Sequence, residues 1–173
     1  LYPACEVVLT EDERRAGIEK MRKEAEEVSA QFRSQRKTEE AYRLKSAIEQ
    51  VAEEAGELQI SAGLDAFLSY FCKERVCLLD YFKKDDVIVF LDEAARSMER
   101  GVATETEFSE SMKQRLEKGY ILPGQMREIF SYREIVGKLE SYCCISLVAL
   151  DLKNKYLDIK ERFHIDTKTV NPY

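Results

Sequence analysis

The sequence predicts an α/β protein that is predominantly helical and contains an incomplete parallel sheet. Two runs, at 87–91 and 143–150, are apolar without alternation, which is typical of strands covered on both faces of a parallel sheet. Elsewhere apolar residues recur every three or four positions within charged stretches, as in amphipathic helices. We therefore expect few strands, with the missing part of the sheet supplied upstream of residue 1, and dimerisation through an open strand edge.

Length and charge limit what the chain can do. Its 173 residues suffice for one domain with a real core, and because it starts at Leu1 we expect 1–173 to be a single-domain fragment of a larger protein. The net charge of −6 argues against a stand-alone duplex binder, since neutralising phosphates requires surplus Lys and Arg.

The apolar runs and the cysteines bear on location. No apolar run approaches the ~20 residues of a membrane helix, so we expect no membrane contact. The five cysteines form no C-x-x-C pair, and the chain has one histidine. This composition favours a cytoplasmic protein with reduced, buried thiols and no structural metal.

The N-terminal part, 10–56, is expected to be a helical hairpin. Thr10 and Glu13 form a capping box, and two stretches with helical spacing follow, separated by the polar residues 33–37. Gly56 is a natural helix stop. Such a pair indicates an antiparallel hairpin that projects from the body and packs against itself or against a partner helix; a single continuous helix is the alternative.

The remaining residues, 57–173, are expected to form the α/β body. Helices are predicted over 60–71, 92–100, 104–118 and 131–142. Strands are predicted over 87–91, 143–150 and 162–166, the last of them half-exposed. Asp92 would cap the second of these helices and Gly101 would end it, while Ser131 with Glu134 would cap the fourth.

The acidic pair, Asp92 and Glu93, directly follows the first apolar run. In phosphate-hydrolysing folds an aspartate at this place holds magnesium and the next glutamate orients the attacking water. Both depend on a phosphate-binding loop, but the pattern G-x-x-x-x-G-K-[ST] does not occur in the chain. The acidic pair is then either a degenerate nucleotide and magnesium motif or a helix cap that complements the helix dipole. We predict no catalytic residue, no metal ligand and no bound cofactor.

Short motifs along the chain resemble the UvrB family and the related family of bacterial transcription-repair coupling factors, Mfd. They are Leu1-Tyr2-Pro3-Ala4, Val7-Val8-Leu9-Thr10, Ser61-Ala62-Gly63-Leu64, Leu78-Leu79-Asp80-Tyr81-Phe82, Phe90-Leu91-Asp92-Glu93, Leu122-Pro123, Phe130-Ser131-Tyr132, Phe163-His164-Ile165 and Val170-Asn171-Pro172-Tyr173. Lys83 replaces a proline of both families. After the acidic pair, Ala94-Ala95-Arg96 stands where UvrB has Ser-His, and is closer to the Mfd pattern.

The resemblance implies the second part of the UvrB-homology module of Mfd, often called domain 1b, with a degenerate P-loop-NTPase-like fold and a non-hydrolysing nucleotide site. The parent would be an ATP-dependent DNA translocase that displaces stalled RNA polymerase and recruits UvrA for nucleotide excision repair. Its ATP and magnesium would bind in motor domains outside these residues. Expected partners are the remaining domains of the parent and, indirectly, UvrA, RNA polymerase and double-stranded DNA.

Two alternatives stay open. The first is half of a UvrB-type helicase core of the excision nuclease, which binds ATP once an upstream segment supplies the phosphate-binding loop. The second is a helical-hairpin scaffold unrelated to repair.

Overall fold

The computed structural model describes residues 8–57, 63–149 and 156–166. Its α-helices are α1 (Glu11–Ser34), α2 (Thr38–Glu57), α3 (Leu68–Phe71), α4 (Ala94–Glu117) and α5 (Tyr132–Leu139). Its strands are β1 (Ile88–Asp92) and β2 (Cys143–Leu147), and its 3₁₀ turns are η1 (Leu64–Phe67), η2 (Leu78–Tyr81), η3 (Lys84–Asp86) and η4 (Pro123–Arg127). This agrees with the predicted α/β, predominantly helical class.

Some of the predictions fall outside the described residues. They concern the motifs at 1–4 and 170–173, the start of the helix predicted over 60–71, and Cys5. Among the residues that are described, no helix is long and apolar enough to cross a membrane.

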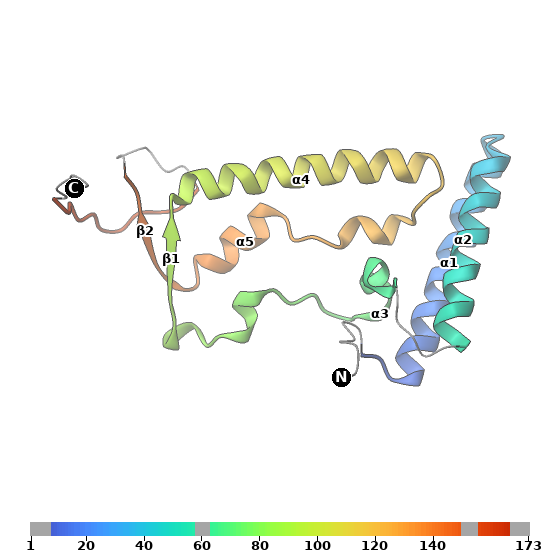
Figure 1. Ribbon diagram of the computed structural model, residues 1–173, viewed down its shortest axis with the longest axis horizontal. Coiled ribbons are helices and arrows are strands. Elements are labelled where there is room, and N and C mark those ends of the chain that lie inside the picture. Colours follow the sequence, from blue (N-terminus) through green and yellow to red (C-terminus); the bar gives the residue numbers. More distant parts are fainter. Residues whose placement is uncertain (1–7, 58–62, 150–155, 167–173) are drawn as a thin grey trace, which may run out of the picture.

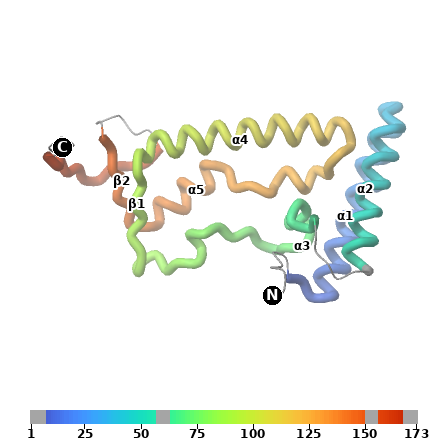
Figure 2. The backbone as a smooth tube through the Cα atoms, in the orientation of Figure 1, coloured from blue at the N-terminus to red at the C-terminus, as the bar shows by residue number. Residues whose placement is uncertain are grey.

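The molecule is elongated, with the α1–α2 hairpin at one end and the two strands at the other (Figure 1). Helix α4 runs along one side from the sheet to the hairpin, and the chain then returns beside it through η4 and α5 to β2 (Figure 2). The segment from α3 through η2 to β1 also runs from the hairpin end to the strand end, on the side of α5 that faces away from α4.

The hairpin has the predicted start and the predicted break. The Thr10 hydroxyl accepts a hydrogen bond from the Glu13 N–H at 3.3 Å, and the Glu13 carboxylate accepts one from the Thr10 N–H at 3.0 Å. Arg36 takes a left-handed backbone conformation, with φ 63°, at the turn between the helices. The chain therefore forms two helices here and not one, and α2 continues through Gly56, where we predicted its end.

The main core lies between the hairpin, α3 and η1, so the prediction of a projecting hairpin is wrong. Met21 and Leu44, from the two helices of the hairpin, are fully buried, and so is Leu122, which follows α4 in the chain. A Cβ added to Gly17 of α1 would lie 2.1 Å from the Phe71 ring, so this ring packs directly on the α1 backbone. The hairpin is thus part of the body's core.

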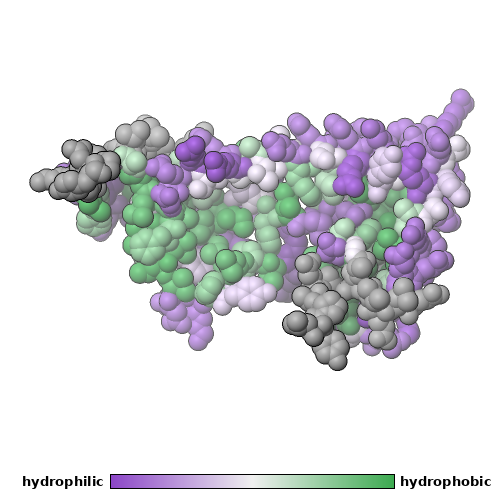
Figure 3. Space-filling view, viewed as in Figure 1, coloured by the Kyte–Doolittle hydropathy of each residue, from purple (hydrophilic) through white to green (hydrophobic). Residues whose placement is uncertain are grey.

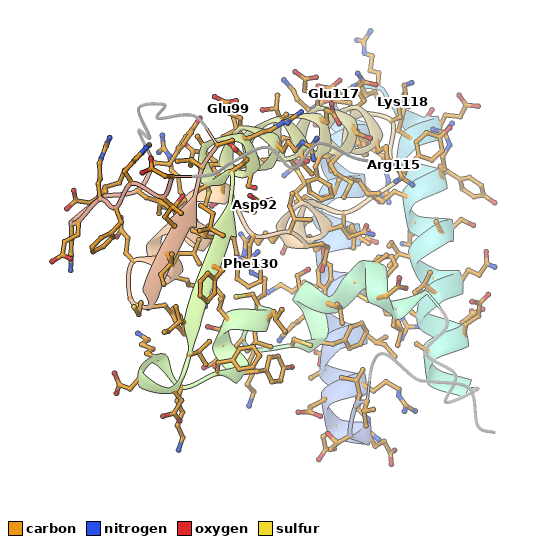
Figure 4. The ribbon with its side chains drawn as sticks, turned by 60° about the vertical axis from the view of Figure 1, so that its left-hand side comes forward. Asp92, Glu99, Arg115, Glu117, Lys118 and Phe130 are labelled. Carbon is orange, nitrogen blue, oxygen red and sulfur yellow. The ribbon has the colours of Figure 1, made fainter. Side chains whose placement is uncertain are left out.

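A second junction joins α2 to the end of α4. The Arg43 guanidinium donates a hydrogen bond to the Lys118 carbonyl at 2.6 Å and lies over the Tyr120 ring, 4.7 Å from its centroid. Gly119, with φ 69°, passes so close to α2 that an added Cβ would lie 2.5 Å from the Glu40 carbonyl oxygen. Figure 4 shows Lys118 at this end of α4, beside the hairpin.

Helix α4 replaces the two helices predicted over 92–118. It passes without interruption through Gly101 and Thr104, where we expected a stop and a new start. A glycine inside a helix costs about 1 kcal/mol relative to alanine, and the burial of Ala94, Met98 and Met112 along one helix outweighs that penalty.

The sheet consists of β1 and β2, paired in parallel from Ile88 opposite Cys143 to Asp92 opposite Leu147. The prediction that both strands are fully covered is wrong for this chain. Ile88 is 52% exposed and Phe90 62% exposed, while the alternating residues Val89 and Leu91 are partly buried. One face of the sheet is therefore open. The four described cysteines are free and none is buried, so the expectation of buried thiols is also wrong.

The third strand, predicted over 162–166, is absent from the described part of the chain. Residues 158–166 have no regular structure, and Phe163 and Ile165 are exposed. Among the described residues, no strand lies beside this alternating segment for it to pair with.

A buried tyrosine links three elements of the core. The Tyr70 hydroxyl donates to the Glu24 carboxylate of α1 and accepts from the Gly124 N–H of η4 at 3.0 Å. Burial, and then the hydrogen bond to Glu24, raises the pKa of Tyr70 above its usual range. Tyr70 therefore stays protonated in the folded protein at pH values where an unfolded tyrosine ionises.

We expect replacement of Tyr70 by phenylalanine to lower the free energy of unfolding by about 1–3 kcal/mol at pH 8, because its two half-buried partners, Glu24 and Gly124, each lose a hydrogen bond. Since the folded pKa is the higher one, the contribution of Tyr70 is complete below about pH 10 and decreases as pH rises above it. Urea unfolding at pH 8 and near pH 11 should show the gap between the two proteins narrowing. Tyr42→Phe, at a position that is 76% exposed, should show no gap at either pH; a constant gap for Tyr70→Phe would contradict the assignment.

Candidate functional site

The acidic pair lies where a parallel sheet usually binds ligands, at the carboxyl end of a strand. Asp92 is the last residue of β1 and is exposed (Figure 4). Its carbonyl accepts a hydrogen bond from the Ser97 hydroxyl at 3.3 Å. Its carboxylate makes no hydrogen bond or ion pair within residues 8–57, 63–149 and 156–166. The prediction that the Asp92 side chain caps the next helix is therefore wrong.

Glu93 takes the cap position of α4 but does not cap it with its side chain. Its backbone is left-handed, with φ 49° and ψ 54°. Its N–H donates to the Leu147 carbonyl at 2.8 Å, and its carboxylate accepts from the Ala149 N–H at 2.9 Å. Glu93 thus holds the chain that leaves β2, and the acidic pair is divided into one exposed carboxylate and one carboxylate engaged with the backbone.

No group of three or more histidine, cysteine or acidic side chains placed to hold a metal ion is found among the described residues. Asp92 and Glu93 are the acidic residues at this edge of the sheet; the Asp92 carboxylate is exposed, and one oxygen of the Glu93 carboxylate accepts the Ala149 N–H. The interpretation of the acidic pair as a degenerate nucleotide and magnesium motif stays a prediction.

Arg75 is a structural anchor that the sequence did not reveal. Its guanidinium donates to the carbonyls of Arg127 and Ile129, at 2.7 and 2.8 Å, and to the Glu134 carboxylate at 2.8 Å. It also lies over the Phe130 ring, 4.6 Å from its centroid. These contacts fasten the extended chain after α3 to the segment between η4 and α5.

Asp80, in the Leu-Asp-Tyr-Phe motif, is a second anchor. Its carboxylate accepts from the Cys77 N–H at 2.7 Å and pairs with Lys138 of α5 at 2.5 Å. The hydrogen bond from Cys77, followed by the one from Lys138, lowers the pKa of Asp80 to about 2. The Tyr142 hydroxyl donates to the nearby Leu79 carbonyl at 2.5 Å. The motif therefore fixes η2 to α5, and its aspartate is structural.

A large part of the sheet end is apolar and exposed; we call it the open apolar surface. Figure 3 shows an apolar area over β1 and its surroundings, below the polar outer side of α4. Its residues are Ile88 and Phe90 of β1 and Ile145 and Leu147 of β2, which are exposed and share one face of the sheet by their register. Exposed apolar areas of this kind mark interaction sites, and parallel sheets are normally covered on both faces.

Comparison with known proteins finds a similarity over most of the chain. No protein-family profile matches the chain. The chain is 32% identical over 158 residues to UvrABC system protein B of Pseudothermotoga lettingae; the match covers 84% of this chain and 23% of that protein. The chain thus spans less than a quarter of the length of this curated relative. The similarity supports a UvrB-like module, and the assignment to Mfd in particular stays a prediction.

Proposed function

We propose, from this similarity to UvrB, that the chain is a non-catalytic structural and interaction module of a DNA-repair protein, corresponding to domain 1b of Mfd. The parent would be a cytoplasmic, ATP-dependent DNA translocase that displaces stalled RNA polymerase and recruits UvrA for nucleotide excision repair. ATP and magnesium would bind in its motor domains. The residues after the acidic pair, Ala94-Ala95-Arg96, favour Mfd over UvrB.

The open apolar surface is the observation that carries this proposal. A two-stranded parallel sheet with one exposed apolar face is not expected to be stable in a protein that folds alone, because parallel sheets are normally covered on both faces. The matched relative is more than four times as long as the matched stretch. We propose that the remaining domains of the parent cover this surface, while contacts with UvrA, RNA polymerase and double-stranded DNA are made indirectly, through those domains.

The division of the acidic pair supports a role without hydrolysis. An ATPase motif of this type needs the aspartate on magnesium and the glutamate near the attacking water. Here the Glu93 carboxylate accepts the Ala149 N–H at 2.9 Å, and the chain has no phosphate-binding loop.

A UvrB-type helicase half is the second candidate, favoured by two observations. The similar protein is UvrB itself, and Asp92 is exposed at the carboxyl end of β1. In this version an upstream segment would supply the phosphate-binding loop.

Titration with a fluorescent ATP analogue, with and without magnesium, tests the proposal. We expect no magnesium-dependent binding by this chain, and a micromolar magnesium-dependent affinity would refute the non-catalytic role. In the full-length protein, Asp92→Asn should leave the ATPase rate unchanged, because the motor lies elsewhere. Loss of ATPase activity with Asp92→Asn would favour the helicase version.

A further inference from the structure

We propose that Glu93 is a structural clamp that joins the carboxyl ends of β1 and β2, at the edge of the sheet where the acidic motif of a nucleotide site would lie. The inference deepens the proposed non-catalytic function and rests on it, because it explains how an acidic motif persists without hydrolysis. It assigns different roles to the two adjacent carboxylates.

Glu93 reaches the chain leaving β2 at two points: its N–H donates to the Leu147 carbonyl at 2.8 Å, and its carboxylate accepts from the Ala149 N–H at 2.9 Å. Leu147 is the last residue of β2 and is paired with Asp92 in the sheet. Glu93 therefore extends the pairing of the two strands beyond their last regular pair.

The backbone of Glu93 is in the left-handed conformation, with φ 49°. Glu93 and Arg36 are the non-glycine residues with positive φ within 8–57, 63–149 and 156–166. A left-handed conformation is unfavourable for a residue with a side chain, and glycine would adopt it freely. The two hydrogen bonds offset this cost, and the carboxylate can reach the Ala149 N–H from this backbone position.

Asp92 differs from Glu93 in the contacts of its side chain. Its carboxylate has no hydrogen-bond or ion-pair partner in the described part of the chain, and the residue is exposed. A pair working together on magnesium and water would need both carboxylates directed at one ligand. One oxygen of the Glu93 carboxylate instead accepts the Ala149 N–H, so the two neighbouring carboxylates have different surroundings in this structure.

Amide hydrogen exchange at Ala149 tests the clamp, because that N–H is the one the Glu93 carboxylate accepts. Glu93→Ala should increase its exchange rate about tenfold, the effect of losing one hydrogen bond to a charged acceptor. Glu93→Gln keeps an acceptor oxygen and should stay close to the parent protein, and Asp92→Ala, at the neighbouring exposed position, should have no effect. Slow exchange at Leu44 in every variant would show that the hairpin core is intact.

The outcomes separate the clamp from the proposed function. Unchanged exchange at Ala149 in Glu93→Ala would refute the clamp, whatever the chain does with nucleotide. Magnesium-dependent binding of the ATP analogue that is lost in both Asp92→Ala and Glu93→Ala would refute the proposed function, and with it the division of roles. Faster exchange at Ala149 in Glu93→Ala alone, without nucleotide binding by any variant, would support both.

Glu93→Gly, which relieves the left-handed conformation, should unfold at a higher urea concentration than Glu93→Ala; the reverse order would show that the Glu93 backbone is not strained.

Discussion

Replacing Leu122 by alanine is expected to lower the free energy of unfolding by about 2–5 kcal/mol, the usual range for truncating a fully buried leucine. Leu122 is 0% exposed and belongs to the same core cluster as Met21 and Leu44 of the hairpin. The truncation would leave a cavity at the contact between hairpin and body. Urea unfolding followed by circular dichroism gives the change directly.

Leu78→Ala is the matched control for Leu122→Ala. It removes the same atoms from a leucine that is 74% exposed, so the free energy of unfolding should change by no more than about 0.5 kcal/mol. Equal losses for the two variants would contradict the position of Leu122 in the core.

Gly119→Ala should cost about 2–5 kcal/mol in unfolding free energy, for two separate reasons. Its φ of 69° penalises any side chain, by about 1–2 kcal/mol. The new Cβ would also lie 2.5 Å from the Glu40 carbonyl oxygen, and overpacking typically costs ~1–3 kcal/mol. Because the obstacle is backbone, the junction between α2 and the end of α4 would have to open. Thermal unfolding would record the loss.

Gly63→Ala distinguishes the backbone penalty of Gly119→Ala from its steric clash with Glu40. Gly63 also has a positive φ, 87°, but within the described part of the chain no atom lies within 4 Å of the position that an added Cβ would take. It should show only the backbone penalty, about 1–2 kcal/mol. If Gly119→Ala cost no more than Gly63→Ala, the close approach to Glu40 would be wrong.

The features that the sequence predicted well are those encoded over a few residues. The capping boxes at Thr10 and Ser131 both form, because a cap and its partner are three residues apart. The hairpin and the two parallel strands followed from apolar spacing in the same way. The acidic pair was placed at the end of β1 because an apolar run ends immediately before it.

The errors concern features that depend on distant residues. Whether Gly101 ends a helix depends on what the residues around it pack against, and here the burial of Met98 and Met112 keeps α4 continuous. Whether an apolar strand is covered depends on residues elsewhere, and for β1 and β2 they are not among those described.

The side-chain contacts around the candidate site also depend on residues that are far apart in the sequence. Arg75 and Glu134 form an ion pair across 59 positions, and Asp80 and Lys138 across 58. No spacing within a single helix or strand predicts either ion pair. The different roles of Asp92 and Glu93 could not be predicted from the sequence either. The Glu93 carboxylate accepts a hydrogen bond from Ala149, which is 56 residues away in the chain.

The length of α4 has a mechanical consequence. With 24 residues it is about 36 Å long, and it begins beside the Glu93 backbone and ends at the Gly119 junction with α2. One helix therefore connects the strands with the hairpin. A partner that binds the strands would act on one end of α4, and the other end is held to the hairpin by the hydrogen bond from Arg43 to the Lys118 carbonyl.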